Sequence, residues 1–161
     1  MAAVNGAAIG IGTTLLLHCD LVYAGEKARF QMPFASLGLC PEFASSYVLP
    51  RLIGHVKAAE LLMLGEVLNA EKALAMGLIN EVLPPESVEE RAYAQAARLA
   101  KQAPQALRVT KRLMRQSYGA NMQKAIDVEM THFSELLKGE EMQEAIDAFM
   151  QKRAADFSRF E

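Results

Sequence analysis

FQMPFASLGLCPEFASSYVLPRLIG, the segment Phe30–Gly54, joins the predicted strands of this chain to its predicted helices. At its centre, Pro41-Glu42 places a carboxylate between Leu39-Cys40 and Phe43-Ala44. One interpretation is a helix start, because proline and a negative charge are both favoured in the first helical turn. The other is a site of proton transfer, because apolar neighbours disfavour a charged carboxylate and suit it to general acid and base work. Local sequence leaves both open.

A turn with three glycines precedes this segment. Gly6, Gly10 and Gly12 lead into a predicted helix, Thr13–Cys19, and can leave backbone N–H groups facing outward. The spacing is not a dinucleotide fingerprint, because Leu15 stands where the third glycine would be needed. Close packing of a strand on a helix and binding through backbone N–H groups explain the turn equally well.

Short strands and helices alternate through the first half of the chain. Residues 1–5 and 21–24 are expected to be buried strands, and residues 28–31 and 78–83 are expected to be extended. Val56, Ala59, Leu62 and Met63 recur at helical spacing, and Asn69 is expected to cap the next helix, 70–76. This alternation predicts an α/β domain with parallel pairing. Four helices are expected after residue 84, at 87–101, 104–118, 121–138 and 140–155.

Composition excludes several classes of function. The 161 residues suit one domain, and 52% apolar residues predict either a large core or apolar surface covered by partner chains. A net charge of −2 gives no electrostatic case for binding nucleic acid or an anionic membrane. Cys19 and Cys40 are isolated, with neither metal spacing nor a disulfide framework. No apolar run is long enough to span a bilayer, and a cytoplasmic protein is expected.

Candidate chemistry narrows to proton transfer. His18, His55 and His132 have no motif partner, which disfavours nucleophilic catalysis through any of them. The glycine turn and Glu42 together suit proton transfer beside a carbonyl. Backbone N–H groups would stabilise the oxygen as it becomes an enolate, and the carboxylate would move the proton.

Three runs then identify a family resemblance. AVNGAAIGIG at residues 3–12, CDLVYA at 19–24 and the pattern from Leu64 to Val82 resemble the enoyl-CoA hydratase/isomerase (crotonase) superfamily. The resemblance covers essentially the whole chain. It implies a crotonase-like (ClpP/crotonase) β-β-α superhelix, an α/β fold, here N-terminally truncated and followed by a helical region. Residues 1–84 would form the C-terminal part of the core, and residues 85–161 would cover the active site and form oligomer contacts.

Within the superfamily, residues 32–47 look like the Δ3,Δ2-enoyl-CoA isomerase branch. The hydratases' two catalytic glutamates fall on Thr14 and Phe34 of this chain, so neither is present. The isomerases' single catalytic glutamate falls on Glu42, and their oxyanion N–H falls on Ile11. The resemblance thus implies that a double bond moves from the 3-position to the 2-position of a fatty acyl-CoA.

The resemblance also implies the surroundings of this site. Substrate-contacting residues would be Gly10, Gly12, Phe34, Leu37, Leu39 and Phe43, and Lys152 and Phe157 are weaker candidates for contacts to coenzyme A. Coenzyme A is part of the substrate, and no further cofactor or metal is expected. A homotrimer or hexamer is the family's usual assembly.

One expectation concerns the N-terminal portion that members of the superfamily carry and this chain lacks. Family members carry an N-terminal portion before the glycine turn, with the second oxyanion donor and part of the coenzyme A pocket. The chain as given is therefore expected to be a poor isomerase, or inactive. Two alternatives stay open: a hydratase-like or other enzyme of the superfamily, and an inactive oligomerising module.

Overall fold

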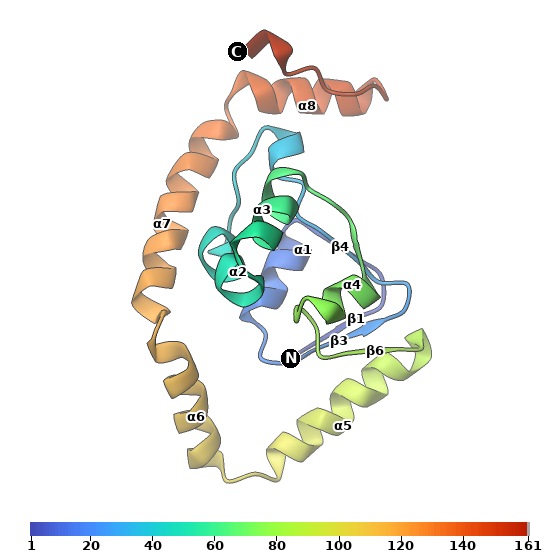
Figure 1. Ribbon diagram of the computed structural model, residues 1–161, viewed down its shortest axis with the longest axis vertical. Coiled ribbons are helices and arrows are strands. Elements are labelled where there is room, and N and C mark those ends of the chain that lie inside the picture. Colours follow the sequence, from blue (N-terminus) through green and yellow to red (C-terminus); the bar gives the residue numbers. More distant parts are fainter. Residues whose placement is uncertain (161) are drawn as a thin grey trace.

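Two three-stranded sheets form the centre of the molecule in the computed structural model, which describes residues 1–160 (Figure 1). The first has the order β1-β3-β6 and the second β2-β4-β5. All the strand pairs are parallel except β4 with β5, so the predicted parallel pairing is confirmed for three of four pairs. The strands are β1 (Ala2–Val4), β2 (Ala7–Ile9), β3 (Val22–Gly25), β4 (Arg29–Gln31), β5 (Leu68–Asn69) and β6 (Glu81–Leu83).

Helices make up most of the rest of the described chain. The first half contains α1 (Ile11–Thr14), η1 (Leu15–His18), η2 (Ala35–Leu37), α2 (Ser45–Ile53), α3 (His55–Met63) and α4 (Ala70–Ala75). The second half contains η3 (Pro85–Ser87), α5 (Val88–Ala100), α6 (Pro104–Gln116), α7 (Gly119–Leu136), α8 (Glu140–Met150) and η4 (Ser158–Phe160). Asn69 caps α4 as expected, because its side-chain oxygen accepts a hydrogen bond of 2.8 Å from the Lys72 N–H.

The core lies between the sheets and the helices α2 to α4. Phe30 of β4, Met32, Leu49 of α2 and Leu61 of α3 are almost fully buried. The expectation of a buried strand at residues 1–5 is wrong, because β1 is an edge strand and Ala3 is exposed. The strand β2 was not predicted, since AAIG reads equally well as the entry to a helix.

The helices after residue 84 surround this centre rather than join it (Figure 1). Helix α5 packs on β1 and β3, α7 packs on α2, and α8 packs on η2. Helix α6 has no buried residue and reaches the centre through polar contacts, including a salt bridge of 2.5 Å between Lys111 and Asp20. None of the helices in the described part of the chain is long and apolar enough to cross a bilayer.

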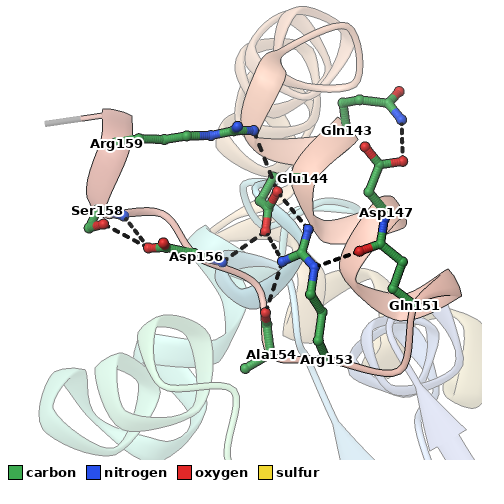
Figure 2. Close-up of polar contacts among 9 residues, drawn as sticks. All are labelled: Gln143, Glu144, Asp147, Gln151, Arg153, Ala154, Asp156, Ser158 and Arg159. Atoms are coloured by element: carbon green, nitrogen blue, oxygen red, sulfur yellow. Dashed lines mark hydrogen bonds and ion pairs between the residues drawn. The ribbon is translucent and has the colours of Figure 1, made fainter.

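Helix α8 ends at Met150 and not near Ala155 as expected, because the chain reverses at Lys152, which has φ 54°. Figure 2 shows the returning chain gathered on Glu144, whose side chain is 5% exposed. The Glu144 carboxylate accepts hydrogen bonds from the Arg153 guanidinium and from the Asp156 N–H at 2.9 Å, and Arg159 lies 3.4 Å away. These donors hold the tail against α8.

The contacts of Glu144 with Arg153, Asp156 and Arg159 predict that acid releases the tail that follows α8. The hydrogen bond from Arg153, followed by the Asp156 N–H and the nearby positive charges, lowers the pKa of Glu144 from 4.5 to about 2. The contribution of the ionised Glu144 to holding the tail against α8 is therefore complete above pH 4.5, and it is lost as the pH falls through 2. We expect hydrogen exchange at the Asp156 amide to accelerate over this range. Glu144→Gln should give fast exchange already at pH 6, and slow exchange in that variant would contradict the assignment.

Candidate active site

The glycine turn lies where β2 enters α1. Gly10 has φ 56°, a left-handed conformation that glycine adopts without steric penalty, and its N–H donates to the Gln31 carbonyl at 2.9 Å. At the third residue of α1, the buried Thr13 hydroxyl donates to the Ala8 carbonyl at 2.5 Å and accepts from the Gln31 N–H at 3.1 Å. The turn is therefore fixed to both β2 and β4.

The backbone N–H of Ile11 is available for a ligand. Ile11 is the first residue of α1, and the first N–H groups of a helix have no acceptor within it. Among residues 1–160, no backbone or side-chain oxygen accepts a hydrogen bond from this N–H. The Ile11 side chain is 57% exposed. The turn thus presents an N–H donor outside the core.

Glu42 lies beside the same helix. Its Oε1 accepts a hydrogen bond from the hydroxyl of Thr14, which is fully buried in α1. Side chains on a helix lean toward its N-terminus, and the Thr14 hydroxyl accordingly lies 3.4 Å from the Ile11 carbonyl. Glu42 is half-buried. The structure thereby brings the carboxylate of the Pro41-Glu42 segment to the first turn of α1.

The interpretation of Pro41-Glu42 as a helix start is wrong, because α2 begins three residues after Glu42. Helix α2 begins at Ser45, and both Phe43 (φ 56°) and Ala44 (φ 58°) take left-handed conformations before it. Such a conformation costs a residue with a side chain about 1–2 kcal/mol. The Glu42 carbonyl accepts from the Ser45 N–H at 3.1 Å, which closes a turn between the carboxylate and α2.

The four apolar residues expected to contact substrate have different surroundings. Phe34 is 5% exposed and belongs to the core, and Leu39 packs partly against that core. Leu37 is exposed, whereas the Phe43 ring lies 4.3 Å from the His18 ring. Of these, Phe43 adjoins Glu42 in sequence, while Phe34 lies inside the protein.

The two residues proposed to contact coenzyme A lie in the tail after α8. Lys152 is exposed at the chain reversal, and Phe157 is half-buried. Figure 1 shows this tail beside α8 near the C-terminus. Within residues 1–160, no hydrogen bond or ion pair joins either side chain to Glu42, so their contact with coenzyme A stays a prediction.

A groove of about 300 Å³ lies elsewhere, between the centre and α6. Its lining includes Leu17, Tyr47, Arg51, Met114 and Tyr118, and none of the predicted site residues. Within residues 1–160, no cluster of three His, Cys, Asp or Glu side chains is placed to hold a metal ion.

Two polar residues near the site were not singled out for it from the sequence. Glu129 of α7 is buried and accepts hydrogen bonds from the Ala44 and Ser46 N–H groups. A ring nitrogen of His18 donates to the Phe43 carbonyl at 2.7 Å. The only signal available for Glu129 was a carboxylate in an amphipathic helix, which usually means a solvated residue.

The fold and the site define the chain as a crotonase-fold protein. The family model for enoyl-CoA hydratase/isomerase matches residues 1–159 of the chain, and the chain belongs to that family. It is similar to the enoyl-CoA hydratase/isomerase of Pseudoalteromonas atlantica T6c, with a TM-score of 0.92 and 39% identity over 95% of this chain and 62% of that one. The resemblance inferred from the sequence is confirmed.

The curated relatives include both enoyl-CoA hydratases and enoyl-CoA isomerases. The chain is 38% identical to the 2,3-dehydroadipyl-CoA hydratase of Escherichia coli K12, over 98% of this chain and 62% of the relative. It is 37% identical to enoyl-CoA delta isomerase 2 of Rattus norvegicus, over 95% of this chain and 39% of the relative. The chain therefore spans less than two thirds of the length of these relatives, and similarity alone does not separate the two reactions.

Proposed function

We propose that this chain carries the catalytic glutamate of a 3-enoyl-CoA isomerase, an enzyme that moves the double bond of a fatty acyl-CoA from the 3-position to the 2-position. The observation that carries the proposal is the contact between Glu42 and α1. The half-buried carboxylate of Glu42 is hydrogen-bonded to Thr14. Three residues before Thr14, the Ile11 N–H is a donor that has no acceptor within residues 1–160. This pairs a base with a donor for an oxyanion.

Proton transfer at such a site balances without a cofactor. The Glu42 carboxylate removes a proton from C2 of the 3-enoyl thioester, and the electrons delocalise onto the thioester oxygen as an enolate. The Ile11 N–H and a second donor stabilise that oxygen. The protonated Glu42 then returns the proton to C4, which leaves the double bond between C2 and C3. One carboxylate serves both carbons.

We prefer isomerisation to hydration as the reaction because of the residues at two positions, Thr14 and Phe34. By the family resemblance, a hydratase would hold glutamates where this chain has Thr14 and Phe34. Thr14 is fully buried and donates to Glu42, and Phe34 is packed in the core. Neither residue can activate water. An assay with 3-hexenoyl-CoA, following the conjugated product, tests the proposal against hydration of crotonyl-CoA; hydration without isomerisation would overturn it.

We further expect a trimer or a hexamer. Large apolar side chains on α6 and α8 are 60–80% exposed, namely Leu113, Met114, Phe149 and Met150. Large apolar side chains exposed in this way on two separate helices are unfavourable in water and are typical of subunit contacts. Sedimentation at micromolar concentration should show the assembly, and charged substitutions at Leu113 and Met114 should weaken it. A clean monomer for the unaltered chain would contradict the expectation.

A further inference from the structure

We infer that Glu129 of α7 is a positioning residue for Glu42, acting by holding the left-handed turn between that carboxylate and α2. The inference rests on the proposed function, because it holds that Glu129 keeps Glu42 in position for proton transfer. The two residues are far apart in sequence and are connected through Ala44 and Ser46, which lie two and four residues after Glu42.

The hydrogen bonds of Glu129 are divided between its two carboxylate oxygens. Oε2 accepts from the Ala44 N–H at 2.6 Å. Oε1 accepts from the Ser46 N–H at 2.9 Å and from the Ser46 hydroxyl at 2.5 Å. A charged acceptor at a helix N-terminus is favoured both by its hydrogen bonds and by the helix dipole. The side chain is only 6% exposed, so these contacts are shielded from water.

Helix α2 needs this outside acceptor. Ala44 occupies the N-cap position and has no side-chain oxygen to offer. The Ser45 and Tyr47 N–H groups find acceptors locally, at the Glu42 and Ala44 carbonyls. The Ala44 and Ser46 N–H groups are those that Glu129 satisfies. Without it, the buried Ala44 N–H would be unpaired, which native proteins avoid, and the Ser46 N–H would depend on solvent.

The turn is also held from its other side. His18, at the end of η1, donates to the Phe43 carbonyl at 2.7 Å and packs its ring on the Phe43 side chain. Arg115 of α6 in turn donates to the His18 carbonyl at 2.7 Å. Phe43 and Ala44 are both non-glycine residues at positive φ, a state that persists only where surrounding contacts impose it. His18 and Glu129 supply those contacts at the carbonyl and at the N–H of the peptide group that joins Phe43 to Ala44.

The consequence for catalysis is geometric. Glu42 has to reach C2 and C4 of the substrate while it stays bonded to Thr14, and its backbone is continuous with the turn. A displacement of about 1 Å in a catalytic group costs on the order of 10²-fold in rate. Relaxation of the turn should therefore lower kcat more than it raises KM.

The test uses Glu129→Gln, which keeps the size of the side chain but has a single acceptor oxygen, so that it cannot satisfy both N–H groups. Glu135→Gln is the matched control, because Glu135 lies on the same helix with 72% of its side chain exposed. We expect hydrogen exchange at the Ala44 and Ser46 amides to accelerate at least about tenfold in the first variant only. In the isomerase assay, its kcat should fall on the order of 10–10²-fold, with KM within about twofold.

Unchanged exchange at both amides would overturn the inference, and so would faster exchange with wild-type kcat and KM. Ser46→Ala, at an exposed position, removes one hydrogen bond without threatening the fold and decides the matter if Glu129→Gln does not fold. It should lower kcat several-fold without changing KM, and wild-type kinetics would then refute the inference. If Glu42→Gln keeps full activity, the proposed function fails, and the exchange data still decide whether Glu129 holds the turn.

Discussion

Glu42→Gln should lower the rate of isomerisation by a factor on the order of 10²–10⁴ while the protein remains folded. The amide keeps the shape of the side chain and can still accept the hydrogen bond from Thr14, but it cannot take a proton from C2. Because one carboxylate both removes and returns the proton in the proposed mechanism, no second base is present to compensate. This loss, like the kinetic changes expected for the other variants, should be measured as kcat with 3-hexenoyl-CoA in a version of the protein that also carries the N-terminal portion that the family resemblance implies.

Two comparisons make this result specific. Glu135→Gln changes the charge by the same amount at an exposed position and should keep wild-type activity. Thermal unfolding of the Glu42→Gln variant should match that of the unaltered protein within a few degrees. Retained isomerisation in a folded Glu42→Gln variant would remove Glu42 from the mechanism and leave the family assignment intact.

Local signals in the sequence predicted most of the elements correctly. Asn69 was expected to cap a helix, and it does so through a bond to a residue only three positions away. The strand at residues 21–24 was expected to be buried, and β3 is the central strand of its sheet. These features depend on neighbours in the chain or on a simple apolar pattern, so they can be inferred from one sequence.

Features that depend on distant contacts were not predictable. The start of α2 was misplaced because the turn at Phe43-Ala44 is held by Glu129, 85 residues after Ala44. Helical spacing of Val56 and Met63 indicated an apolar face, yet these side chains are 78% and 71% exposed and Ala58 and Leu61 are buried instead. Apolar periodicity identifies a helix but does not say which surface covers each face. The substrate-contacting role of Phe34, Leu37 and Leu39 likewise stays a prediction.

The second large effect is expected at Ile11, where the proposed mechanism uses only the backbone. Ile11→Pro removes the N–H and should lower kcat/KM with 3-hexenoyl-CoA on the order of 10²–10³-fold, the usual effect of losing one oxyanion donor. The substitution should be tolerated by the fold. Ile11 is the first residue of α1, a position where proline is favoured, and its side chain is 57% exposed. The preceding Gly10, with φ 56° and ψ −119°, lies outside the α-region that clashes with a following proline.

Ile11→Ala is the control that separates the backbone from the side chain. It deletes most of the exposed side chain and keeps the N–H, so its activity should stay within a few-fold of the unaltered protein. Circular dichroism and thermal unfolding should confirm that both variants fold. If the proline variant turns over at the rate of the alanine variant, the Ile11 N–H does not bind the enolate oxygen. The oxyanion donors would then have to lie elsewhere, and the pairing of Ile11 with Glu42 would no longer explain the site.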